Sequence, residues 1–106
     1  MTFRPVASDE ELADGFPLLV HVDGVPVCLV RSEGEVFAIG DICSHGQVSL
    51  SEGEVDGCEI ECWLHGSRFD LRTGRPLSLP ATEPVPVHPV KLEDGKVLVD
   101  VEETIA

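Results

Sequence analysis

The sequence predicts a single all-β domain, and three observations support this prediction. At 106 residues the chain has the length of one domain. Its apolar runs are short, rich in Val and bounded by turn residues, with 10 Gly and 8 Pro in total. Asp-Gly pairs at 23–24, 56–57 and 94–95 each separate two such runs, and this dipeptide is a strong hairpin signal.

The N-terminal half begins with a helix signal and continues with strands. Ser8 and Glu11 are spaced as a capping box, which predicts a helix of about one and a half turns that ends at Gly15. Apolar runs at 16–22 and 25–31 then predict a hairpin, and 36–39 predicts a third strand that completes a small meander.

The C-terminal part predicts two further hairpins, over 55–63 and over 87–101, with residues 102–106 frayed. Between the outer strands, 41–80 is dense in Gly, Ser, His and Cys, and four prolines between 79 and 89 predict a stiff, extended loop. Because the short strands at each end need each other to close a core, we expect a β-sandwich or barrel base of 1–40 and 81–106. A subdomain of about 41–80 is inserted in it.

The charge and the absence of apolar segments exclude several classes of function. With 20 acidic against 7 basic residues, the net charge of −13 disfavours nucleic acid and anionic membranes as partners. The first residues do not resemble a signal peptide, and no stretch approaches the ~20 apolar residues of a membrane span. We therefore expect a cytoplasmic protein, whose four cysteines are ligands or buried thiols.

Two short motifs combine cysteine with histidine. The first motif contains Cys43 and His45, and the second contains Cys62 and His65. In each motif a glycine follows the histidine, and sixteen residues separate the two motifs. Two thiolates with two imidazoles can bind zinc, but zinc knuckles usually pair like ligands. Mixed pairs suit a two-iron cluster in which cysteines hold one iron and histidines hold the other. Zinc remains the alternative at this point.

Beyond the ligands, the sequence resembles a known family over nearly its whole length. The pattern C-x-H-x₁₆-C-x-x-H is similar to the Rieske [2Fe–2S] motif, as are the segments 66–70, Thr73-Gly74 and the proline run from Pro76. The likeness is greatest to the ferredoxin components of bacterial aromatic-ring dioxygenase systems. It implies one Rieske cluster per chain, with its inner iron held by the cysteines and its outer iron by the histidines, that is Cys43, Cys62, His45 and His65.

The resemblance also implies a role. Such a protein is an electron carrier without catalytic residues of its own, which takes single electrons from a flavin-dependent reductase and passes them to a terminal oxygenase. Monomer is the default expectation for a carrier that must dock with two partners. Two alternatives stay open. The first is a stand-alone Rieske ferredoxin that serves another redox pathway or iron–sulfur assembly. The second is a zinc-stabilised interaction module.

Departures from the high-potential Rieske proteins imply a low reduction potential. Val48 and Leu64 stand where those proteins carry two bridging cysteines, and Phe69 stands where they carry a tyrosine hydroxyl. Ser67 keeps the serine position. Fewer hydrogen bonds to the cluster stabilise its reduced form less, so we expect a midpoint at the lower end of the Rieske range, roughly −150 mV.

The remaining cysteines and histidines are expected to be structural. Cys28 lies within an apolar strand and is interpreted as a small buried hydrophobe. Cys58 alternates with Ile60 and Cys62, and we interpret it as an inert thiol. His21 and His88 have no matching cysteine and are expected at the surface or at a sheet edge.

Overall fold

The computed structural model describes residues 3–44, 48–64, 66–79 and 81–105. Strands dominate it, which confirms the all-β prediction, and its helical segments in these ranges are two single 3₁₀ turns. The elements in chain order are β1 (Arg4–Ser8), η1 (Asp9–Glu11), β2 (Leu18–Val22), β3 (Val25–Ser32), β4 (Glu35–Gly40), η2 (Leu50–Glu52), β5 (Glu54–Asp56), β6 (Glu59–Glu61), β7 (Arg68–Asp70), β8 (Val87–His88), β9 (Val90–Glu93) and β10 (Lys96–Val99). Neither 3₁₀ turn, nor any other part of the described chain, supplies a helix of the length and apolar character that crossing a bilayer requires.

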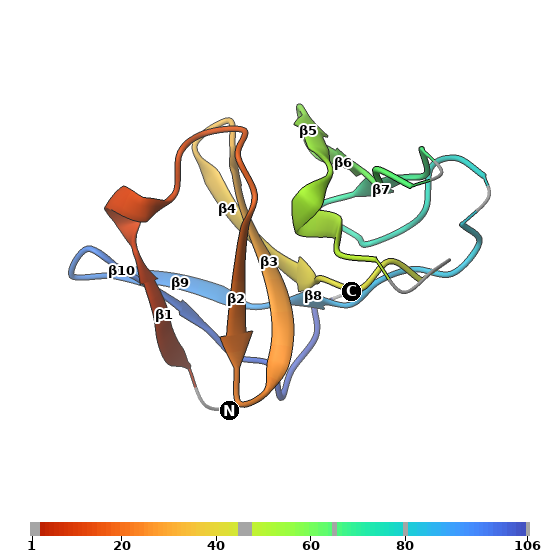
Figure 1. Ribbon diagram of the computed structural model, residues 1–106. Helices are drawn as coiled ribbons and strands as arrows, with labels where there is room; N and C mark the ends of the chain where they lie inside the picture. Colours follow the sequence, from red (N-terminus) through yellow and green to blue (C-terminus); the bar gives the residue numbers. More distant parts are fainter. Residues whose placement is uncertain (1–2, 45–47, 65, 80, 106) are drawn as a thin grey trace.

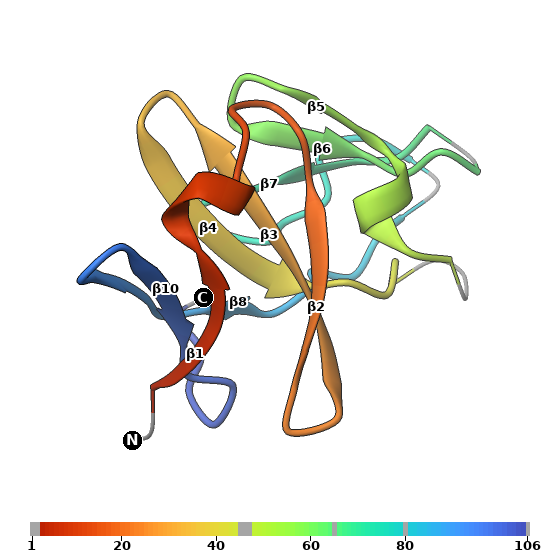
Figure 2. The same cartoon turned by 60° about the vertical axis from the view of Figure 1, so that its left-hand side comes forward.

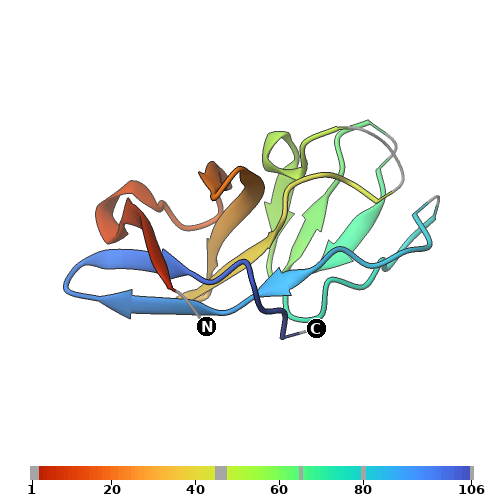
Figure 3. The same cartoon turned by 90° about the horizontal axis from the view of Figure 1, so that it is seen from below.

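The strands form three antiparallel sheets. Two of them, with orders β1-β10-β9 and β2-β3-β4-β8, combine strands from both ends of the chain. The third, β5-β6-β7, stands to one side of them. Seen from below, the β5-β6-β7 sheet and the long loop after it occupy one end of an elongated molecule, and β1, β9 and β10 occupy the other (Figure 3).

Tight turns join the strands at the predicted positions. Asp23 (φ 52°) and Gly24 (φ 83°) both lie in the left-handed region, as do Asp94 (φ 51°) and Gly95 (φ 75°). Two successive left-handed residues define the type I′ turn, whose twist matches that of a hairpin. The hairpins β2-β3 and β9-β10 therefore follow from local sequence.

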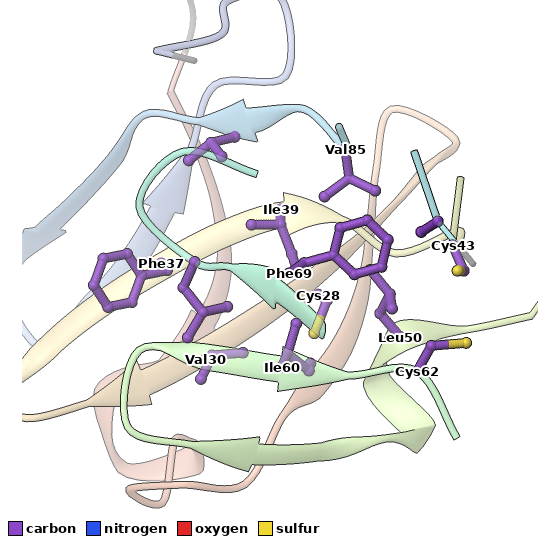
Figure 4. Close-up of a cluster of buried hydrophobic side chains, with 13 residues drawn as sticks. Cys28, Val30, Phe37, Ile39, Cys43, Leu50, Ile60, Cys62, Phe69 and Val85 are labelled. Atoms are coloured by element: carbon purple, nitrogen blue, oxygen red, sulfur yellow. The ribbon is translucent and has the colours of Figure 1, made fainter. Parts of the chain in front are cut away.

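Two hydrophobic clusters fill the molecule. The first lies between the two sheets built from the chain ends, and it is formed by Leu12, Val22, Val27, Leu29, Ala38, Val97 and Val99. The second lies between β3-β4 and the β5-β6-β7 sheet (Figure 4), with Phe69 at its centre beside Ile39 and Ile60. Burying large side chains such as Phe69 contributes about 1.5–3 kcal/mol each and fixes the third sheet against the rest.

The predicted N-terminal helix is wrong beyond its first turn. The capping box is present, since the Ser8 N–H donates to Glu11 Oε1 at 2.9 Å, but only Asp9–Glu11 form a 3₁₀ turn. Arg31 donates to the carbonyls of Leu12 (3.1 Å) and Asp9 (3.2 Å). The Asp9 carbonyl also accepts the 3₁₀ bond from the Leu12 N–H at 3.3 Å, whereas the Leu12 carbonyl bonds to the β3 side chain and no further helical turn follows.

In the C-terminal region one prediction holds in part and another is wrong. His88 lies on β8, the edge strand of its sheet, which is one of its two predicted places, but it is only 5 % exposed, and its Nδ1 lies 2.8 Å from the carbonyl oxygen of Glu103. The Ile105 N–H donates to the Val87 carbonyl at 2.8 Å, so the tail lies against β8 rather than fraying, as Figures 1 and 2 show. His21 is exposed, as predicted.

Candidate metal centre

The first cysteine motif begins directly after β4. The chain turns back on itself through a bridge between Ile42 and Ser49, and the Cys43 N–H donates to the Val48 carbonyl at 2.9 Å. Cys43 is 3 % exposed. Its predicted partner His45 lies outside the described residues, together with 46 and 47.

The second motif begins directly after β6 and forms an equally tight loop. The Cys62 N–H donates to the Ser67 carbonyl at 2.7 Å, and the Gly66 N–H returns to the Cys62 carbonyl at 2.9 Å. Gly66 has φ 75°, a conformation that other residues adopt only with strain. Cys62 is 1 % exposed, and its predicted partner His65 lies outside the described residues.

The two loops bring their cysteines to the same end of the second hydrophobic cluster. Figure 4 shows the sulfurs of Cys43 and Cys62 beyond Leu50, at the margin of the cluster, whereas Cys28 lies within it. Neither of the two predicted ligand cysteines forms a disulfide within the described chain. No group of three or more potential metal ligands occurs within the described ranges, which omit both predicted histidine ligands.

This donor set fits a soft metal centre. Two buried thiols that approach from two separate loops supply the sulfur ligands that iron–sulfur clusters and zinc both accept. The geometry described so far does not choose between the two metals. The choice depends on the mixed Cys–His spacing of the sequence.

The proline-rich segment is bonded to both cysteine loops. Ser44 Oγ donates to the Glu83 carbonyl at 2.5 Å, and the Ala81 N–H donates to Ser67 Oγ at 3.0 Å. A third bond of 2.8 Å runs from the Val85 N–H to the Gly74 carbonyl. The segment thus packs its buried Ala81 and Val85 against the second cluster and ties the two cysteine loops together.

Replacing Ser67 with alanine tests this connection. Ser67 is fully buried, so Ser67→Ala leaves the Ala81 N–H without its acceptor, and we expect a loss of about 1–3 kcal/mol in the free energy of unfolding. Ser78→Ala is the matched control, because Ser78 Oγ accepts from the Arg68 N–H at an exposed site. Denaturant unfolding of both variants measures the difference; equal losses would contradict the buried role of Ser67.

The other two cysteines lie away from the two ligand loops. Cys28 is fully buried in β3, and burial, reinforced by the negative charge of Asp41, raises the pKa of its thiol far above the ordinary range. It therefore stays a protonated thiol, in agreement with its interpretation as a buried hydrophobe.

Cys58 lies at the turn between β5 and β6. Its sulfur accepts a hydrogen bond of 3.5 Å from Arg72 Nη2, and the same guanidinium forms a bidentate pair with Glu35 at 3.0 and 3.2 Å. The bond to Glu35 is the main cause that raises the pKa of Arg72. Because Glu35 belongs to β4, this contact joins the third sheet to the rest of the molecule, and Cys58 is part of that junction.

Beside the second loop lies an acidic pocket of about 310 Å³. It is lined by Glu52, Glu54, Glu61, Cys62, Trp63 and Gly66. Trp63 is 53 % exposed, and the next residue, Leu64, is exposed as well. An indole and three carboxylates thus line the pocket next to Cys62. The sequence did not reveal this arrangement, because the glutamates lie on different elements.

Comparison with known protein families shows which family the chain belongs to. The profile of the Rieske [2Fe-2S] domain matches residues 2–89. The biphenyl dioxygenase ferredoxin subunit of Pseudomonas sp. (strain KKS102) is 44% identical over 101 residues, which cover 94% of this chain and 93% of that protein. The ferredoxin component of the naphthalene 1,2-dioxygenase system of Pseudomonas aeruginosa is 42% identical over 90 residues, 85% of this chain and 86% of that one.

Solved structures show the same fold. The ferredoxin of carbazole 1,9a-dioxygenase from Nocardioides aromaticivorans IC177 superposes with a TM-score of 0.89 at 40% identity, covering 93% of this chain and 97% of that one. A chain from the complex of reduced oxygenase and oxidized ferredoxin in carbazole 1,9a-dioxygenase superposes with a TM-score of 0.91 at 35% identity, covering 98% and 97%. The strand arrangement described above is therefore that of these ferredoxins.

Proposed function

Because the chain belongs to the Rieske [2Fe–2S] domain family, we propose that it is the ferredoxin component of an aromatic-ring dioxygenase system. The observation that carries this proposal is the agreement with such ferredoxins at 44% identity over 94% of the chain and 93% of the relative. The match extends nearly end to end, so that this chain and its relative share one domain plan. In such a dioxygenase system the ferredoxin carries electrons, and a separate oxygenase performs the chemistry on the aromatic ring.

The proposed ligands of the cluster are Cys43, His45, Cys62 and His65, all within the subdomain of about 41–80. The burial of both cysteines at one end of the second hydrophobic cluster supports this assignment, and the mixed spacing supports the histidines. When bound, the cluster supplies a site that accepts and releases one electron. The chain's own contribution is to fix the two loops and to exclude water from the sulfurs with the proline-rich segment.

The proposed partners are a flavin-dependent reductase and a terminal oxygenase. One of the structural relatives comes from a complex between oxygenase and ferredoxin, which supports the second partner. A carrier that meets two partners in turn is best a monomer. We also place it in the cytoplasm, where reducing conditions keep the described cysteines as thiols.

The acidic pocket beside Trp63 supports a docking role for this end of the molecule. Its carboxylates form no ion pair with any lysine or arginine in the described part of the chain, whereas most of the basic residues there pair elsewhere. Unpaired carboxylates around an exposed indole complement a partner surface with basic groups. The net charge of −13 would steer such a partner over longer distances.

Electron transfer to the oxygenase is therefore expected to slow as ionic strength rises. Salt screens the attraction between opposite charges, so the second-order rate constant falls when association is electrostatically steered. Stopped-flow measurements between low and high salt test this. Glu54→Gln should flatten the dependence more than Glu10→Gln, an exposed control on η1. Rates that do not change with salt would leave solubility as the only use of the charge.

Spectroscopy tests the cofactor directly. The purified protein is expected to be brown, with a rhombic electron paramagnetic resonance signal only after reduction. A colourless protein with stoichiometric zinc would overturn the proposal in favour of an interaction module. A brown protein that is not reduced by the flavin-dependent reductase of any dioxygenase system would instead point to another redox pathway or to iron–sulfur assembly.

A further inference from the structure

The segment that follows β7 exposes apolar side chains next to one another. Leu77 is 50 % exposed and Leu79 is 78 % exposed. Leu77 lines two hollows of the surface, one of about 450 Å³ together with Arg75 and Pro84, and one of about 350 Å³ together with Leu79. We call Arg75, Leu77, Leu79 and Pro84 the leucine flank. Exposed apolar side chains that lie together, rather than singly, indicate an interaction site.

Hydrogen bonds fix the backbone of the leucine flank. The Leu77 N–H donates to the Arg68 carbonyl at 2.6 Å, and the Arg68 N–H donates to Ser78 Oγ at 3.0 Å. The Arg75 carbonyl accepts from the Asp70 N–H at 2.9 Å. Leu77 is thus exposed on a backbone that is already held in place. A partner that covers it does not have to order the loop first, which lowers the free-energy cost of binding.

Arg75 gives the leucine flank a positive charge. Its guanidinium forms no ion pair with any carboxylate in the described ranges, whereas Arg68 and Arg72 both form ion pairs. Asp70 lines the same hollow, but its Oδ1 accepts from the Arg72 N–H at 2.8 Å. An unpaired guanidinium beside exposed leucines complements a partner surface on which a carboxylate lies next to apolar side chains.

The acidic pocket beside Trp63 lies at the opposite edge of the third sheet. The strand order of this sheet is β5-β6-β7, and Glu54 of the acidic pocket belongs to β5. Pro76 forms a bridge with Phe69 of β7, so the leucine flank lies beyond the β7 edge. In Figure 1, β6 lies between β5 and β7. The sheet therefore separates two surfaces of opposite charge.

A partner patch that fits one of these surfaces does not fit the other. Basic groups that complement the glutamates of the acidic pocket are repelled by Arg75, and acidic groups that complement Arg75 are repelled by the glutamates. Both surfaces adjoin the cysteine loops. Cys62 lines the acidic pocket, and Pro84 of the leucine flank follows Glu83, whose carbonyl accepts from Ser44 Oγ. The chain therefore offers two different docking surfaces beside one redox centre.

We propose that the leucine flank docks the flavin-dependent reductase, through apolar side chains and a carboxylate of that partner, while the acidic pocket docks the oxygenase. This inference rests on the proposed function, which supplies both partners. The acidic pocket already accounts for the partner with basic groups, so the leucine flank falls to the other one. At the leucine flank one electron passes from the reduced flavin to the carrier, and at the acidic pocket the same electron passes to the oxygenase.

Binding measurements with the cluster-loaded, oxidised protein test the proposal. The probes are the reductase and the oxygenase that exchange electrons with the unmodified protein. Leu77→Ser and Arg75→Gln should each raise the Kd for the reductase by about fivefold or more, because each removes an anchor of the interface. Their Kd for the oxygenase should stay the same.

Two matched controls lie at the other end of the molecule. Leu92 is 51 % exposed on β9, and Lys96 is an exposed cation on β10 that forms no ion pair within the described residues. Leu92→Ser and Lys96→Gln should leave both Kd values unchanged. Leu79→Ser, at a more exposed position than Leu77, replaces Leu77→Ser if that variant does not fold.

Glu54→Gln supplies the reverse test. It should raise the Kd for the oxygenase and leave the Kd for the reductase unchanged, because Glu54 lines the acidic pocket alone. Reduction by dithionite, which needs no docking surface, should proceed equally in every variant and so shows that the redox centre is intact. Reduction by the reductase, at concentrations below its Kd, should slow only in the variants of the leucine flank.

Loss of affinity for both partners in the variants of the leucine flank would overturn the proposal, because one surface would then serve both. Loss for the oxygenase alone, or for neither partner, would also overturn it. These failures are distinct from failure of the proposed function, which the spectrum and the electron exchange of the unmodified protein decide. Loss for the reductase alone supports the proposal.

Discussion

Cys62→Ser is expected to yield a protein without the visible absorption of an iron–sulfur cluster. The hydroxyl of serine is a far poorer ligand for iron than a thiolate, and the loop from Cys62 to Ser67 contains no other sulfur that could take its place. Cys43→Ser should have the same effect. The measurement is the visible spectrum together with iron and sulfide content per chain, and the expected change is from full occupancy to essentially none.

Two variants provide matched controls for the ligand assignment. Cys58→Ser alters a thiol on the same hairpin as Cys62, at its opposite end, and should keep the cluster. His45→Ala and His65→Ala should lose it, whereas His21→Ala, at an exposed position on β2, should not. A His45 or His65 variant with an unchanged spectrum would refute the histidine assignment.

Gly74→Ala is expected to cause a large loss of stability. Gly74 has φ 74°, and a Cβ at this position would lie 2.0 Å from the carbonyl oxygen of Val85. The left-handed conformation costs about 1–2 kcal/mol for alanine, and relieving the clash would break the bond between the Val85 N–H and the Gly74 carbonyl. We expect more than about 3 kcal/mol of destabilisation in total, which thermal unfolding detects as a drop of roughly 12 °C or more.

Gly95→Ala separates the cost of the steric clash from the cost of the left-handed backbone conformation. Gly95 has nearly the same φ, 75°, but no atom lies within 4 Å of the added Cβ. This variant should therefore lose only about 1–2 kcal/mol. Because Gly74 anchors the proline-rich segment, Gly74→Ala should also speed the loss of the cluster in air, and Gly95→Ala should not. Equal stability losses in the two variants would contradict the close approach of Val85.

The parts of the fold that the sequence predicted are those determined by local chemistry. Type I′ turns require left-handed residues, so Asp23-Gly24 and Asp94-Gly95 identified two hairpins directly. The strands β1 and β7 were not predicted. Arg4–Ser8 pairs with a strand at the other end of the chain, and Arg68–Asp70 is only three residues long. Their pairing partners, rather than their own composition, make them strands.

In the candidate site, too, the sequence predicted the local features but not the long-range contacts. The ligand motif is local, and the sequence indicated Cys43 and Cys62, which the structure brings to one end of the core. The contacts that hold the loops were not visible in the sequence. Ser44 bonds to a residue 39 positions away, and Ser67 bonds to a residue 14 positions away. The burial of His88 at its sheet edge was not foreseen for a similar reason, because its hydrogen-bond partner Glu103 follows fifteen residues later.

The pairing of β1 with β10 has a consequence for the synthesis of the protein. Arg4 lies opposite Val99, so β1 has no partner until β10 has been synthesised. The hairpins β5-β6 and β6-β7, in contrast, pair residues close in sequence and can form while the chain is still growing. The two cysteine loops are therefore synthesised before the base that supports them can close. An extension or truncation at the C-terminus would act first on closure of the base, and only through it on the cluster.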